Sequence, residues 1–271
     1  MSAEALPPLR EALEAHGLLA RKSLGQHFLL DLNITRKIVR LAEIDPGDLV
    51  IEVGPGPGGL TRALIEAGAE VIAVEKDPRF APLLEPLAAF GPLHLQLADA
   101  LSADEAALTG GRSAQVVSNL PYNVGTPLLV KWLTGRFAPT AMTLMFQKEV
   151  AERIVAAPGS GAYGRLAVIA QACAEARIVM EVPARAFTPP PKVDSAVVRL
   201  RLRPDRPTPD RLVALQALTA AAFGQRRKML RSSLKPLGGT ALCAAAGIDA
   251  DRRAETLSVA EFLALADARS L

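Results

Sequence analysis

Cysteine and long apolar runs are both scarce in this sequence. The 271 residues include only two cysteines, Cys173 and Cys243, which have neither the spacing of metal ligands nor a disulfide framework. We expect both to pack in the core of a protein from a reducing cytoplasm. No apolar run approaches the ~18 residues of a membrane-spanning helix. Residues 1–22 mix both charge signs ahead of any apolar stretch, so we expect no secretory signal.

The remaining composition is that of a globular protein. Half of the residues are hydrophobic and 22% are charged, which excludes wholesale disorder. The net charge is only +3, but residues 199–235 hold ten lysines and arginines against two aspartates. Such a block is typical of a surface that faces phosphate backbones, although an ordinary solvated basic face is the alternative.

Strand-like and helical segments alternate after residue 47. Short apolar runs predict parallel strands over residues 48–53, 70–75, 93–97, 114–118 and 140–146. Helical spacing predicts helices over residues 60–67, 78–90 and 126–133. This alternation predicts an α/β fold with a doubly wound, Rossmann-like sheet and ligands at the carboxyl ends of its strands.

The pattern changes in the last third of the chain. Residues 175–182 and 195–202 look like strands with no helix between them, which predicts an antiparallel closing of the sheet. Residues 203–209 have the composition of a linker, and the rest looks helical. We therefore expect one domain over residues 1–204, with an N-terminal helical extension, and a small helical C-terminal domain over residues 205–271.

A glycine-rich segment, residues 54–59, follows the first strand and opens a helix. Gly54, Gly56 and Gly59 fit the dinucleotide-binding fingerprint, and Glu75 stands where a carboxylate binds a ribose diol. The spacing does not choose between NAD and S-adenosylmethionine, because both carry that diol.

Two further carboxylates favour S-adenosylmethionine. Glu52 precedes the first glycine by two residues, where it would repel a pyrophosphate but suit a sulfonium or ammonium group. Asp99 follows the third strand, where it could accept a hydrogen bond from an adenine amino group. An aspartate at a strand end also serves as a helix cap, but Ser102 is the better candidate for that role. We expect no metal.

Asn119-Leu120-Pro121-Tyr122 follows the fourth strand. The exocyclic amine of a base is a poor nucleophile, because its lone pair is delocalised into the ring. The Asn119 amide oxygen and the Leu120 carbonyl, held by Pro121, could accept its two N–H groups and direct that lone pair at a methyl donor. Tyr122 offers a ring on which an extruded base can stack. The alternative is an ordinary turn with a buried tyrosine.

Five segments occur in order: KSLGQHFL at residues 22–29, EVGPG at 52–56, NLPYN at 119–123, FTPPPKVDS at 187–195 and FGQRRK at 223–228. Together they resemble the ribosomal RNA adenine dimethyltransferases of the KsgA type. The resemblance implies a class I methyltransferase that acts in ribosome biogenesis. It would transfer methyl groups from S-adenosylmethionine to N6 of two adjacent adenines in the 3′-terminal hairpin of small-subunit (16S) rRNA. The partner would be the assembling small subunit.

The resemblance also implies roles for single residues. Cofactor contacts are expected from His27, Leu29, Gly54, Gly56, Glu75, Asp99 and Asn119. Phe187 could form the second face of a base sandwich with Tyr122, and Arg226, Arg227 and Lys228 are expected to contact RNA phosphates. His27 stands where the family commonly has asparagine, so the atom that contacts the donor is open.

Three alternatives remain. A large-subunit rRNA methyltransferase of the antibiotic-resistance type shares the glycine loop and an Asn-x-Pro-aromatic motif, although residues 187–195 and 223–228 favour the small-subunit enzyme. An NAD-dependent oxidoreductase leaves residues 119–122 and the basic block without a role. A ribosome-assembly factor without catalysis would have a damaged site, whereas Glu75, Asp99 and Asn119 are intact. Nothing suggests an obligate dimer, and we expect a monomer.

Overall fold

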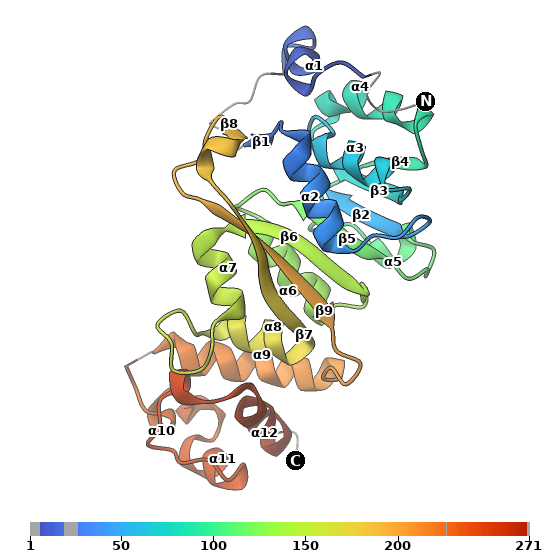
Figure 1. Ribbon diagram of the computed structural model, residues 1–271. Helices are drawn as coiled ribbons and strands as arrows, with labels where there is room; N and C mark the ends of the chain where they lie inside the picture. The colour runs from blue at the N-terminus through green and yellow to red at the C-terminus, as the bar shows by residue number, and fades with distance from the viewer. Residues whose placement is uncertain (1–5, 19–26, 226, 270–271) are drawn as a thin grey trace. The chain divides into compact units, whose positions relative to one another are not determined.

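The computed structural model describes residues 6–18, 27–225 and 227–269. In this part of the chain a seven-stranded sheet has the order β4-β3-β2-β5-β6-β9-β7 (Figure 1). Its strands are β2 (Leu49–Val53), β3 (Glu70–Glu75), β4 (Leu93–Leu97), β5 (Gln115–Asn119), β6 (Ala141–Gln147), β7 (Ala174–Val182) and β9 (Ser195–Leu202). A separate two-stranded sheet pairs β1 (Phe28–Leu29) with β8 (Phe187–Thr188).

The strand order reverses beside β2. The chain runs outward from β2 to β3 and β4, and then returns to β5 on the other side of β2. All of these neighbours pair in parallel, as do β5 and β6, whereas β9 is antiparallel to β6 and lies between β6 and β7. This is the predicted doubly wound sheet, and its reversal point favours a ligand crevice at the carboxyl ends of β2 and β5.

The helices of this region include those predicted over residues 60–67 and 126–133, and two that were not predicted, over residues 105–108 and 148–155. They are α1 (Leu9–Ala15), α2 (Leu32–Ala42), α3 (Gly59–Glu66), α5 (Glu105–Leu108), α6 (Gly125–Thr134) and α7 (Lys148–Val155). The single helix predicted over residues 78–90 is wrong. The segment instead forms three short turns, η3 (Pro78–Phe80), α4 (Ala81–Leu84) and η4 (Glu85–Ala89), because Pro82 and Pro86 lack the N–H that continues a helix.

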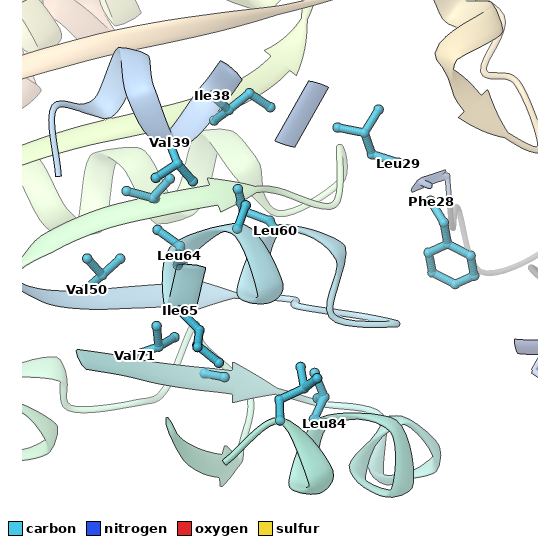
Figure 2. Close-up of a cluster of buried hydrophobic side chains, with 14 of the residues drawn as sticks. Phe28, Leu29, Ile38, Val39, Val50, Leu60, Leu64, Ile65, Val71 and Leu84 are labelled. Carbon is cyan, nitrogen blue, oxygen red and sulfur yellow. The ribbon is translucent and has the colours of Figure 1, made fainter. Parts of the chain in front are cut away.

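A hydrophobic core lies between the sheet and helices α2 and α3. Figure 2 shows Val50 of β2 and Val71 of β3 close to Leu64 of α3, with Ile38 and Val39 of α2 beside them. All five residues of β2 are buried, as expected for a central parallel strand covered on both faces. This packing fixes the start of α3, and with it the glycine-rich turn between β2 and α3.

The chain forms two compact units. The first holds Met1–Trp132, Arg136–Ala151 and Arg177–Arg201, and the second holds Leu133–Gly135, Glu152–Ala176 and Leu202–Leu271. Helices of the second unit are α8 (Arg165–Cys173), α9 (Pro209–Gly224), α10 (Leu230–Ser233), α11 (Gly239–Ala245) and α12 (Val259–Arg269), with the turns η6 (Lys235–Leu237) and η7 (Ala254–Thr256). The predicted helical C-terminal region is therefore present. Residues 152–176, which precede the expected boundary at 204, join it because α8 packs on α9 and α12.

Both cysteines are buried, as predicted. Cys173 and Cys243 are buried and free, and burial raises the pKa of the Cys173 thiol to about 11. Each therefore packs as a small apolar side chain. In the described part of the chain, no helix combines the length and hydropathy needed to cross a membrane.

Candidate active site

The turn between β2 and α3 depends on glycine. Gly54, Gly56 and Gly58 have φ angles of +66°, +54° and +83°, a region that side chains with a Cβ rarely adopt. A Cβ on Gly56 would also lie 3.3 Å from the Phe28 ring. The turn thus presents bare backbone to the crevice and packs directly on the segment around β1.

Glu75 ends β3 beside this turn. Its Oε2 accepts a hydrogen bond from the Gly56 N–H at 3.1 Å, and its Oε1 accepts one from the Asp77 N–H at 2.8 Å. Burial raises the pKa of Glu75, and these hydrogen bonds oppose the rise. The carboxylate is therefore oriented by backbone groups before any ligand binds.

Glu52 is a buried carboxyl under the same turn. It is 2% exposed, and its Oε2 accepts a hydrogen bond of 2.7 Å from the Thr61 hydroxyl. Burial raises its pKa to about 8, and the charge of Glu75 adds to the rise. Glu52 is thus largely neutral at pH 7, and a nearby cation would favour its ionised form.

Asp99 holds the loop that follows β4. Its Oδ1 accepts a hydrogen bond from the Leu101 N–H at 3.0 Å, and its Oδ2 pairs with Lys76 Nζ at 2.7 Å. The hydrogen bond from Lys76 is the main reason that the pKa of Asp99 is lowered. The prediction that Ser102 caps the next helix is wrong, because Asp104 accepts from the Ala107 N–H and caps α5.

Asn119-Leu120-Pro121-Tyr122 faces the glycine turn. Asn119 is the last residue of β5, and its half-buried side chain has no hydrogen-bond partner among the described residues. A Cβ on Gly54 would lie 3.4 Å from Pro121 Cδ, so the two segments are in near contact. The motif predicted for the target base and the turn predicted for the methyl donor therefore share one site.

The Tyr122 ring is held by two neighbours. Its hydroxyl lies 2.7 Å from Ser195 Oγ, and its ring stacks on His27 with centroids 5.7 Å apart. His27 Nδ1 lies 2.8 Å from the carbonyl oxygen of Pro189. A carbonyl only accepts, so Nδ1 carries the proton and donates. A base that stacks on Tyr122 must take the ring face that His27 leaves open.

Phe187 lies in a different environment from the one its predicted role requires. It is 3% exposed, pairs with Leu29 across β1 and β8, and belongs to the hydrophobic core. It is not among the described residues that line the cavity. The sandwich with Tyr122 stays a prediction, and in this conformation His27 is the aromatic neighbour of Tyr122.

These segments enclose one cavity of about 500 Å³, within the usual range of roughly 300–1,000 Å³ for small-ligand sites. The predicted residues that line it are His27, Leu29, Gly54, Gly56, Glu75, Asp99, Asn119, Leu120, Pro121 and Tyr122. Phe28, Lys76 and Leu101 also line it, although they were not predicted as site residues. Lys76 and Leu101 are neighbours of Glu75 and Asp99, but no pattern in the sequence marks them.

The basic block of residues 199–235 is not one continuous surface. Arg199 is 3% exposed, and both it and Arg201 pair with Glu43. Arg211 pairs with Asp267 and Arg231 with Asp251. Interpreting the whole block as facing phosphates is therefore wrong for Arg199. Arg227 and Lys228 are exposed, and Arg226 lies outside the described residues.

Comparison with known proteins decides the family. Residues 17–269 match the family model described as ribosomal RNA adenine dimethylase. The chain belongs to this family. A ribosomal RNA small subunit methyltransferase A of Phenylobacterium zucineum (strain HLK1) is 73% identical over 269 residues, which cover 99% of this chain and 94% of the relative.

Two solved structures have the same fold as this dimethylase. A dimethyladenosine transferase from Plasmodium falciparum superposes with a TM-score of 0.72 at 26% identity, covering 88% of this chain and 96% of that one. The 23S rRNA methyltransferase ErmE superposes with a TM-score of 0.67 at 28% identity, covering 90% and 100%. The predicted family, fold class and enzyme class are confirmed, and an NAD-dependent oxidoreductase is ruled out.

S-adenosylmethionine is the methyl donor of this dimethylase, and the cavity fits it. Backbone of the glycine turn leaves room for close approach, and Glu75 is oriented at the strand end where a ribose diol binds. A cationic ligand near the buried Glu52 carboxyl would lower its raised pKa and favour the carboxylate, which would then attract the cation. Asp99, which follows β4, would supply an acceptor for the adenine amino group of the donor.

Proposed function

We propose that this dimethylase transfers methyl groups from S-adenosylmethionine to N6 of two adjacent adenines in the 3′-terminal hairpin of small-subunit (16S) rRNA. The observation that carries the proposal is the single cavity shared by the donor-binding turn and the Asn119–Tyr122 segment. Support for the small subunit comes from the 73% identical relative, which is named a small-subunit methyltransferase.

The chemistry needs orientation more than a strong base. The Asn119 side-chain oxygen, which lacks a protein partner among the described residues, and the Leu120 carbonyl accept the two N–H groups of the target amine. Its lone pair then points into the cavity. S-adenosylmethionine, when bound, supplies a methyl group on a cationic sulfonium. The amine becomes acidic only once methylated, so water can take its proton.

Tyr122 holds the base plane. Its hydroxyl contact with Ser195 and its stacking on His27 fix the ring, so the open face can receive an adenine extruded from the hairpin. Phe187 would complete the sandwich only after leaving its buried position.

The large-subunit alternative has weaker support. ErmE, a 23S rRNA methyltransferase, is 28% identical to this chain, whereas the small-subunit relative is 73% identical. The intact Glu75, Asp99 and Asn119 oppose a purely non-catalytic assembly factor.

We further propose how the dimethylase meets its substrate. A cytoplasmic monomer binds the assembling small subunit. Its first unit is the methyltransferase domain, and its helical domain comprises residues 205–271 together with residues 152–176, which pack with them. Arg226, Arg227 and Lys228 contact phosphates of the RNA.

The test is methyl transfer from labelled S-adenosylmethionine to small subunits that lack this modification, followed by mass spectrometry of the digested RNA. We expect label in two adjacent adenines of the 3′-terminal hairpin and none in purified large subunits. Label confined to large-subunit RNA would support the alternative, and no label in either would refute both.

A further inference from the structure

A partly buried ion pair, between Lys131 and Glu105, connects helix α6 to the loop that carries Asp99. The Lys131 ammonium on α6 donates hydrogen bonds to the carbonyl oxygens of Ala100 at 2.8 Å and Ala103 at 2.6 Å, and to Glu105 Oε1 at 2.9 Å. An ammonium has three N–H groups, so each has an acceptor. Within the described residues, no other group donates to these two carbonyl oxygens.

The acidic partner is more deeply buried than the lysine. Glu105 begins α5 and is 3% exposed. Its carboxylate also accepts the indole N–H of the buried Trp132 at 2.7 Å. Removing Lys131 alone would leave this carboxylate buried without its cation, which is strongly unfavourable.

These contacts converge on residues 98–103, the loop between β4 and α5. Asp99, Ala100 and Leu101 line the cavity, whereas Lys131 and Glu105 are not among its described lining residues. The loop is tightly turned, because the Asp99 carbonyl oxygen accepts from the N–H groups of Ser102 and Ala103, each at 3.0 Å. The hydrogen bonds of Lys131 therefore reach the cavity through the loop backbone, and its positive charge also helps to lower the pKa of Asp99.

We propose that Lys131 is a positioning residue for the methyl donor. Through the carbonyls of Ala100 and Ala103, it holds the loop so that Asp99 meets the adenine ring of the donor. This inference rests on the proposed function, because it assumes an adenine-bearing donor in the cavity. A loop that is ordered before binding costs less to order on binding. The effect of Lys131 therefore falls on donor affinity, not on the methyl-transfer step.

The main test combines Lys131→Met with Glu105→Gln, which removes both charges and keeps an acceptor for Trp132. Calorimetry with S-adenosylhomocysteine, without RNA, should show affinity lower by about tenfold or more. The charge-assisted hydrogen bonds that order the loop are lost, so ligand binding must supply that ordering. With unmethylated small subunits, KM for S-adenosylmethionine should rise similarly while kcat stays near the wild-type value. Lys37→Met, at an exposed position of α2, is the matched control and should change neither quantity.

A second variant keeps the charge that Glu105 requires. Lys131→Arg should fold, but a planar guanidinium cannot reproduce three converging ammonium hydrogen bonds, so donor KM should again rise. Faster hydrogen exchange at the Leu101 amide, which donates to Asp99, should accompany it. If the double variant does not fold, the donor KM of the Lys131→Arg variant tests the inference on its own.

Wild-type donor affinity in the folded variants, or a fall in kcat with unchanged KM, would overturn the inference. Failure of the proposed function has a different signature, because wild-type protein would then bind S-adenosylhomocysteine without methylating small subunits. In that case the calorimetric comparison of wild type and variants would still test whether Lys131 contributes to donor affinity.

Discussion

Glu52 links the folding of this dimethylase to pH. Its pKa in the folded state is about 8, against an ordinary value of 4.5, so between these values the folded state binds a proton that the unfolded state has lost. The free energy of unfolding should therefore fall as pH rises through this window, by at most about 1.4 kcal/mol per pH unit. Glu52→Gln should remove this contribution.

Urea unfolding of wild-type and Glu52→Gln protein between pH 5 and pH 8 measures this effect. The difference in free energy of unfolding between the two proteins should change steadily with pH, and the wild type should become less stable relative to the variant at higher pH. A difference that is constant across the window would contradict the proposed linkage.

Glu75 is expected to bind the donor ribose. Glu75→Ala removes a carboxylate that backbone N–H groups already orient, and should weaken S-adenosylmethionine binding by about 1.5–3 kcal/mol. Calorimetry measures the change, and circular dichroism checks that the variant is folded. Wild-type affinity in a folded variant would remove Glu75 from the donor site.

Substitution of Asn119 should affect the methylation rate without affecting RNA binding. Asn119→Ala removes one of two acceptors for the target amine, and should lower the methylation rate by roughly 10²–10³, by analogy with a lost oxyanion-hole donor. RNA affinity should change little. The second transfer starts from an amine with one N–H left, so monomethyladenine should accumulate and be visible by mass spectrometry. Full dimethylation at the wild-type rate would exclude this role.

Two substitutions of Tyr122 separate the contribution of its ring from that of its hydroxyl. Tyr122→Ala should lose stacking worth about 1–3 kcal/mol per base, whereas Tyr122→Phe should keep most activity although it loses the hydrogen bond with Ser195. Methylation rates of the two variants give the comparison. Equal losses in both would mean that the hydroxyl, and not stacking, is what matters.

At the scale of elements, the connection between α9 and α10 carries the predicted phosphate contacts. Neutralising Arg226, Arg227 and Lys228 together should weaken RNA binding and reduce the log–log salt slope by roughly 0.7–0.9 for each phosphate that is no longer neutralised. Donor binding should persist. The matched control neutralises Arg211 and Arg231, which pair with acidic residues of the protein. A wild-type salt slope in the triple variant would show that these side chains do not meet RNA.

Elements with a strong local pattern could be predicted from sequence. The apolar runs of β2 and β3 agree with the structure to within one residue, because buried parallel strands need continuous apolar residues. The bounds of β4 also agree, although this edge strand has the sequence LHLQL and none of its five residues is fully buried. The single helix over residues 78–90 was wrong because apolar spacing alone does not register the backbone N–H groups that its prolines lack. Helix α8 was missed because residues 165–173 are apolar almost throughout, and such a run has no helical periodicity.

The site was predictable only as separate parts. Glycines, strand-end carboxylates and the Asn119–Tyr122 segment each carry their own local signal, and the sheet topology brings them to one cavity. The contacts of His27 with Tyr122 and of Lys131 with Ala100 and Ala103 join segments distant in sequence. No local pattern encodes them, because they depend on how the whole first unit packs.

Across the whole molecule, the pairing of β1 with β8 sets an order of events during synthesis. Phe28 meets Thr188, and His27 meets Pro189, so one wall of the cavity needs residues made early and residues made much later. Contacts between such distant segments form late in folding, because the intervening chain must first be closed into a loop. A nascent chain that has emerged only through Tyr122 has its glycine turn and target-base motif but not the wall that fixes His27. We therefore expect donor binding to be acquired only after residue 189 has left the ribosome, so that a shorter nascent chain cannot yet hold a methyl donor.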